Sequence, residues 1–127
     1  MSQRTPLAKV RGLGSAKEGT DHFWKQRVTG VANLILVCWM FVVLAKIAGA
    51  DYQTVKSTLA RPQNAIAIAL LMMSASMHMR LGMQVIIEDY VHGEGRKILL
   101  LMLNTFFVVA VAAICIFSLL KLSFVEV

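Results

Sequence analysis

The chain has 127 residues, of which 57% are hydrophobic and 16% charged, and its 13 Lys and Arg against 7 Asp and Glu give a formal net charge of +6. So few polar side chains could not cover a water-soluble domain of this length, and so apolar a composition also excludes intrinsic disorder. Cys38 and Cys115 lie inside apolar runs without C-x-x-C spacing, which argues against a disulfide framework or a zinc site.

A basic leader, residues 1–27, precedes the first apolar run. Basic clusters beside a hydrophobic span favour retention of that side in the cytoplasm, so the leader is expected to be cytoplasmic and no nucleic-acid partner is needed to explain the charge. The leader contains six basic residues: Arg4, Lys9, Arg11, Lys17, Lys25 and Arg27.

Three long apolar segments follow, at residues 28–50, 62–90 and 98–121. About 23 residues at 1.5 Å rise per residue suffice to cross a hydrocarbon core of roughly 30 Å, and the runs do not alternate as barrel strands would. The sequence therefore predicts an all-α membrane protein with three transmembrane helices. The basic residues of the leader and of connection 91–97 outnumber those elsewhere, which predicts that connection 51–61 and tail 122–127 are periplasmic.

Two ionisable residues, His78 and Arg80, lie inside the second apolar segment. His78 lies about 14 Å by helical rise from Ile87 at the expected cytoplasmic end. Ionisable groups in hydrocarbon cost several kcal/mol unless they are partnered, so His78 predicts either a hydrogen bond to a neighbouring helix or axial ligation of a haem iron. No other His lies in a span, so a six-coordinate haem would need its second ligand from another polypeptide.

The second segment ends in the run Glu88-Asp89-Tyr90-Val91-His92. A phenol there could hydrogen-bond a quinone carbonyl, and a carboxylate could relay protons from water. Taken alone, this run is better explained as an interfacial belt with a Tyr anchor and a solvated acid at a helix end.

The run from His78 to His92, HMRLGMQVIIEDYVH, resembles the small haem-associated membrane anchor subunit of succinate dehydrogenase, respiratory complex II, through its H-x3-G-M-Q-V-x3-D-Y-V-H pattern. The leader segment GLGSAKEGTDHFWKQRVTGVAN is similar to the N-terminal signature of the α-proteobacterial form. Arg80 departs from the family, where that position is often apolar or aromatic.

The resemblance implies that His78 is an axial ligand of a b-type haem, with Arg27 near the haem propionates. It further implies that Tyr90 binds ubiquinone and that Asp89 lies in the proton-supply region. The implied partners are a cytochrome b subunit, which would complete a heterodimeric helical bundle, an iron-sulfur subunit and a flavoprotein subunit. The implied location is the bacterial cytoplasmic (inner) membrane, where the complex would pass electrons from succinate to quinone.

Two readings from other functional classes compete with this one. A small proton-coupled transporter could use His78 and Arg80, although the other two apolar segments carry no charged residue at mid-depth to line a pathway. A purely structural anchor could recruit soluble enzymes through the basic leader without a redox role.

Overall fold

The computed structural model describes residues 5–12 and 19–124, and this part of the chain is helical, without strands. Three long helices are each long and apolar enough to span a membrane, which confirms the predicted all-α membrane fold. The helices are α1 (Pro6–Val10), α2 (Gly19–Ile47), α3 (Tyr52–Ala60), α4 (Pro62–Tyr90) and α5 (Glu94–Phe124).

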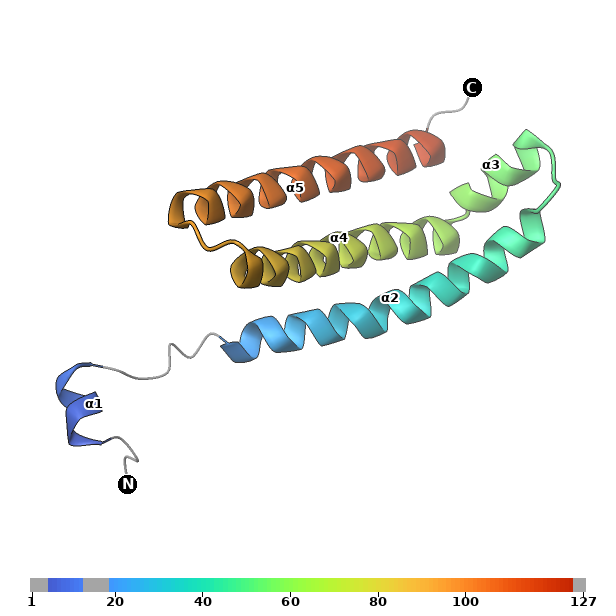
Figure 1. Ribbon diagram of the computed structural model, residues 1–127. Helices are drawn as coiled ribbons and strands as arrows, with labels where there is room; N and C mark the ends of the chain where they lie inside the picture. The colour runs from blue at the N-terminus through green and yellow to red at the C-terminus, as the bar shows by residue number, and fades with distance from the viewer. Residues whose placement is uncertain (1–4, 13–18, 125–127) are drawn as a thin grey trace.

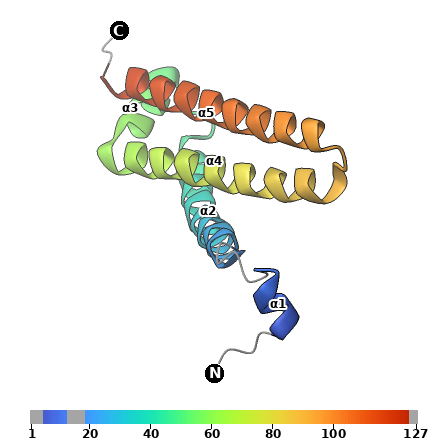
Figure 2. The same ribbon diagram turned by 90° about the vertical axis from the view of Figure 1, so that its left-hand side faces the viewer.

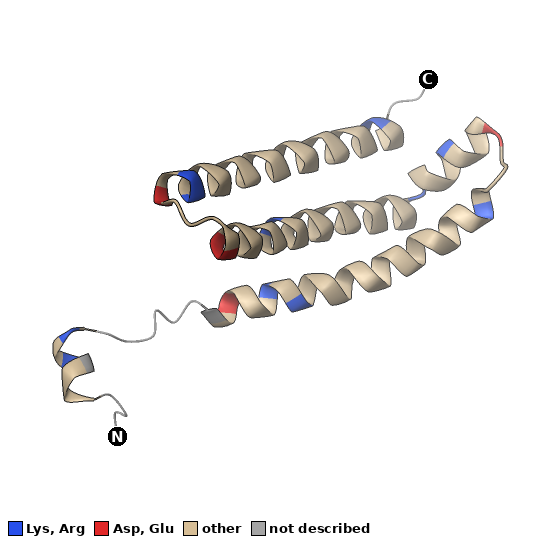
Figure 3. Ribbon diagram, in the orientation of Figure 1, with Lys and Arg blue, Asp and Glu red and all other residues tan. Residues whose placement is uncertain are grey.

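Helix α4 lies between α2 and α5 and contacts both of them along its length (Figure 1). Helices α4 and α5 run antiparallel side by side, whereas α2 crosses this pair at an angle (Figure 2). Charged residues gather toward the two ends of the three-helix layer (Figure 3). The layer therefore has two broad faces, and α4 is the helix that both neighbours cover.

Helix α2 begins at Gly19, well before the apolar run that the sequence analysis expected to start the span at residue 28. Its polar first turns include an exposed ion pair one helical turn apart, with Lys25 Nζ 3.2 Å from an Asp21 carboxylate oxygen. With 29 residues the helix is about 43 Å long, so it extends beyond the hydrocarbon core into the headgroup region. It ends before Gly49, which adopts a left-handed φ of 79°.

The connection 51–61, expected to be a plain linker, contains the short helix α3. Asp51 caps it by accepting hydrogen bonds from the backbone amides of Gln53 and Thr54 at 3.1 and 3.2 Å and from the Thr54 hydroxyl at 2.7 Å. These bonds, the hydroxyl's first, hold the pKa of Asp51 below its usual value. The helix follows from a sequence signal, an Asp ahead of a short helical run, that the span analysis did not use.

The bounds of α4 are those of the second apolar segment, whereas α5 begins at Glu94, ahead of the expected start of the third segment at residue 98. Gly95 therefore lies in the first turn of α5 and not in the connection. The end of α4 is instead held by Lys97, whose ammonium donates to the Glu88 carbonyl at 3.1 Å, and by the Val91 amide, which donates to the Ile87 carbonyl.

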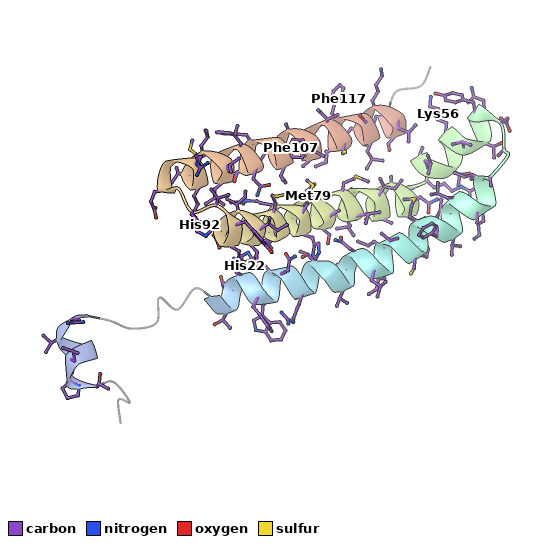
Figure 4. All side chains as sticks on the ribbon, in the orientation of Figure 1. His22, Lys56, Met79, His92, Phe107 and Phe117 are labelled. Carbon is purple, nitrogen blue, oxygen red and sulfur yellow. The ribbon has the colours of Figure 1, made fainter. Side chains whose placement is uncertain are left out.

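The three helices bury little apolar surface against one another. No large side chain among the described residues is completely buried, and Phe107 and Phe117, labelled in Figure 4, are 61% and 69% exposed. So much exposed apolar surface requires lipid or other helices around it. The buried hydrophobic residues are Val43, Ile47, Leu71, Ile87, Val108 and Leu119.

Candidate functional site

Polar side chains line the contact between α2 and α4, which we call the α2–α4 seam. The four α2 residues recur at spacings of four, three and four, so they share one face of the helix. Figure 4 shows His22 on the side of α2 toward α4. The seam consists of His22, Gln26, Thr29 and Asn33 from α2 and of Ser74 and His78 from α4.

His78 lies against Thr29 at the centre of the seam, where His78 Nδ1 and Thr29 Oγ1 are 3.1 Å apart. The Thr29 hydroxyl also lies 2.7 Å from the Lys25 carbonyl and 3.1 Å from the Gln26 carbonyl of its own helix. The single hydroxyl proton of Thr29 must therefore point toward these carbonyl oxygens, because the Thr29 and Lys25 oxygens, 2.7 Å apart, would repel each other without a proton between them. The hydroxyl then accepts from His78, which places the imidazole proton on Nδ1 and leaves a lone pair on Nε2.

Two further contacts fix how α4 lies on α2 at this level. The Ser74 hydroxyl donates to the Thr29 carbonyl at 3.2 Å, so α4 touches both the backbone and the side chain of Thr29, which is itself 8% exposed. Gly30 faces the ring: a Cβ there would lie 3.4 Å from His78 Cε1. The glycine gives the imidazole its close approach to α2.

The seam also contains polar atoms that the described residues leave without a hydrogen-bond partner. His22 Nε2, Gln26 Oε1 and Asn33 Oδ1 are buried and unpaired within that part of the chain. An unpaired buried polar atom costs about 1–3 kcal/mol, so three on one helix face are more than packing alone would retain. The seam is therefore a region of polar chemistry inside an otherwise apolar layer.

A cavity of about 440 Å³ opens beside the seam toward the N-terminal end of α2. Arg80 lines it and is exposed, and its backbone carbonyl accepts a hydrogen bond from Asn104 of α5 at 3.0 Å. Arg80 and His78 meet different groups, since His78 contacts Thr29 whereas Arg80 lines the cavity. The cavity is lined by Asp21, His22, Lys25, Met77, Arg80, Leu81 and Gln84.

The other predicted site residues do not contact His78. They lie toward the end of the layer where α2 begins and α4 ends. Asp89 and Tyr90, in the last turn of α4, are exposed, Tyr90 by 77%, and within the described chain neither side chain is hydrogen-bonded. Arg27 is also exposed, and its guanidinium carbon lies 3.4 Å from the centroid of the Phe23 ring. These three side chains are thus open to groups outside the chain.

The described residues do not form a complete metal site of their own. Within residues 5–12 and 19–124 no three His, Cys, Asp or Glu side chains come together in a group that could hold a metal ion. An iron bound to His78 would therefore need its remaining ligands from elsewhere. The seam partners were missed by the sequence analysis, although the i, i+4, i+7, i+11 spacing of the polar residues on α2 could have revealed them.

Comparison with known proteins matches residues 1–113 to the family model described as succinate dehydrogenase/fumarate reductase transmembrane subunit. The succinate dehydrogenase hydrophobic membrane anchor subunit of Paracoccus denitrificans is 31% identical over 118 residues, which cover 93% of this chain and 91% of that protein. The corresponding subunit of Rickettsia bellii is 29% identical over 111 residues, covering 87% of this chain and 89% of the relative. No solved structure gives a significant match.

Proposed function

The chain belongs to the succinate dehydrogenase/fumarate reductase transmembrane subunit family, and we propose that, as the membrane anchor subunit of succinate dehydrogenase, it binds b-type haem through His78 and ubiquinone through Tyr90. The observation that carries the haem proposal is the Thr29–His78 hydrogen bond at Nδ1. It leaves on Nε2 the lone pair that an iron ligand needs, and histidines that bind metals are commonly held by such a bond through the other ring nitrogen.

The protein groups around His78 suit this role. Thr29 orients the ring, and Gly30 lets the ring approach α2 closely. Bound haem would supply a one-electron carrier between the soluble subunits and quinone. Arg27, whose guanidinium is exposed at the start of the apolar part of α2, would pair with the haem propionates, a geometry that suits its planar donors.

The second axial ligand would come from the cytochrome b subunit. This chain has no other histidine in the middle of a span, because His22 lies in the first turns of α2 and His92 follows the end of α4. The two broad apolar faces of the three-helix layer support a heterodimeric bundle, since the cytochrome b subunit would cover one face and lipid the other. The iron-sulfur and flavoprotein subunits would dock at the end where Tyr90 lies.

Tyr90 and Asp89 suit the quinone site by position and exposure. The phenol of Tyr90 would donate to a ubiquinone carbonyl, and the carboxylate of Asp89 would take protons from water for the reduced quinone. In the proposed orientation, the leader 1–27 and connection 91–97 face the cytoplasm of a bacterial cell. Connection 51–61 and tail 122–127 face the periplasm, and the three spans cross the inner membrane.

Purification through an affinity tag on this chain tests the proposal. We expect flavin-bearing, iron-sulfur and cytochrome b chains to co-purify, with one b-type haem per complex measured by pyridine haemochrome assay. A complex that contains the soluble subunits but no haem would contradict the haem proposal and leave a structural anchor.

The quinone assignment is tested by Tyr90→Phe, with Tyr52→Phe at the opposite end of the layer as the matched control. Loss of a hydrogen bond to the reacting carbonyl is expected to lower succinate:quinone reductase activity roughly tenfold or more, with haem content and assembly unchanged. Equal activity and equal KM for quinone in the two variants would remove Tyr90 from the site.

A further inference from the structure

A small cavity of about 140 Å³ lies at the end of the layer opposite Tyr90, where the C-terminal end of α2 meets α3 and the start of α4. Figure 3 shows basic positions at this end of the layer, at the end of α2, on α3 and between α3 and α4. Lys46 and Arg61 line the cavity, and neither is paired with an acid within the described chain. The cavity is lined by Trp39, Val42, Val43, Lys46, Thr58, Arg61, Gln63 and Asn64.

The polar part of the cavity is suited to an anion. It contains two cationic side chains and no carboxylate, and two like charges around one small space repel unless an anion lies between them. The nearest acid in sequence, Asp51, is occupied as the cap of α3. Asn64, which is only 5% exposed, is held in place by donating to the Thr58 carbonyl at 2.7 Å.

The start of α4 adds to the positive potential of the cavity. Arg61 is its N-cap and makes no capping hydrogen bond with its side chain, and the first turn of α4 contains no acidic residue. The partial positive charge of this helix end is therefore not neutralised by the chain itself. Together with the two basic side chains, it favours a phosphate group over a neutral one.

The other wall of the cavity is apolar and faces outward. Trp39 and Val42 are 48% and 54% exposed, and both lie on the span side of Lys46. A tryptophan beneath a lysine at the end of a span is typical of the headgroup level of a bilayer. A ligand that satisfies both walls has an anionic head and an apolar tail.

We propose that this cavity binds the phosphate of an anionic phospholipid, such as a phosphatidylglycerol, with Lys46 and Arg61 holding the phosphate and the acyl chains lying along Trp39 and Val42. The site is separate from the one proposed for haem and quinone, because none of the residues proposed for those ligands lines this cavity. Its occupant would be a structural lipid that fixes the angle between α2 and α4.

The experiment uses the intact complex purified through this chain and reconstituted into nanodiscs of phosphatidylcholine with a minor fraction of phosphatidylglycerol of the same acyl chains. Native mass spectrometry of the ejected complex counts the retained lipids. We expect the wild-type complex to retain phosphatidylglycerol selectively, and Lys46→Gln with Arg61→Gln to weaken this preference roughly five-fold for each charge removed. The control pair Lys56→Gln with Lys121→Gln removes two charges that do not line the cavity and should retain the lipid.

Titration with inorganic phosphate distinguishes the source of the phosphate group. Displacement of phosphatidylglycerol at low millimolar phosphate would identify a free-phosphate site and overturn the lipid proposal. Equal retention of phosphatidylcholine and phosphatidylglycerol by the wild-type complex would also overturn it, as would unchanged preference in the double variant.

A second measurement covers the case in which the double variant fails to assemble. Lys46→Arg with Arg61→Lys keeps both charges and should keep the wild-type preference, and for both complexes that preference should fall at 0.5 M salt. A preference that does not respond to salt would contradict the charge-based site.

Discussion

The contact between α2 and α4 and the contact between α4 and α5 hold the same central helix in different ways. Among the described residues, the α4–α5 contact has two polar links, from Asn104 to the Arg80 carbonyl and from Lys97 to the Glu88 carbonyl, and both end on the backbone of α4. The buried α5 residues, Val108 and Leu119, are apolar. The α2–α4 seam instead places Thr29 against Ser74 and His78.

The difference is that α5 bonds only to backbone carbonyls of α4, whereas the seam uses the side chains of α4 themselves. Two hydroxyls of α5 bond to their own helix, Thr105 to the Leu101 carbonyl and Ser118 to the Ile114 carbonyl. Since α5 packs on α4 without bonding any α4 side chain among the described residues, the polar side chains of the seam are better explained by a chemical role for His78. We therefore expect substitutions in the two contacts to have different effects on haem binding.

The largest expected effect comes from His78→Ala, with Asn104→Leu as the matched change in the other contact. Because His78 would provide one of two axial ligands, its loss should remove most of the haem or its low-spin spectrum from the purified complex. Asn104→Leu removes one interhelical hydrogen bond and should leave haem content unchanged. The measurement is the haem-to-protein ratio of each purified complex. Equal ratios in the two variants would contradict a special role of the α2–α4 seam in haem binding.

An intermediate effect is expected from Thr29→Val, which removes the hydroxyl that accepts from His78 Nδ1. Loss of such a supporting hydrogen bond lowers metal affinity roughly 10- to 100-fold, so haem should dissociate faster and its reduction potential should shift. Thr105→Val, which loses only a bond within α5, is the control. Identical potentials and identical haem loss rates in both variants would show that Thr29 does not position the imidazole.

The smallest effect is expected from Gly30→Ala. The added Cβ would lie 3.4 Å from His78 Cε1, at the short limit of ordinary van der Waals contact, so the ring shifts by a few tenths of an ångström at most. We expect a small change in the haem spectrum without loss of haem. Gly95→Ala, where a Cβ meets nothing within 4 Å, should leave the spectrum as in wild type. A larger spectral change in Gly95→Ala than in Gly30→Ala would contradict the claim that Gly30 lies beside the haem-binding imidazole.

The sequence predicted the three spans because apolar length is a local property of the chain, and that prediction is confirmed. Local signals also explain the two features of the fold that the sequence analysis missed. The cap formed by Asp51 organises α3 inside an expected linker, and the polar first turns of α2 extend the helix beyond the hydrocarbon core.

The partner of His78 could not be predicted in the same way. Thr29 and His78 are 49 positions apart, and their contact depends on how α4 lies against α2. The pattern of polar residues on α2 indicates a polar face, but it does not indicate which residue of α4 meets it. The roles of Asp89, Tyr90 and Arg27 remain predictions, since those roles depend on groups outside this chain.

The most direct test of the central claim is imidazole rescue in a His78→Gly complex. The variant keeps space for a free imidazole beside Thr29, while the cytochrome b subunit would still hold the other face of the haem. We predict that the reduced, low-spin b-type spectrum is lost in His78→Gly and returns in a saturable manner when imidazole is added. A His78→Gly complex with the wild-type spectrum in the absence of imidazole would contradict haem ligation by His78.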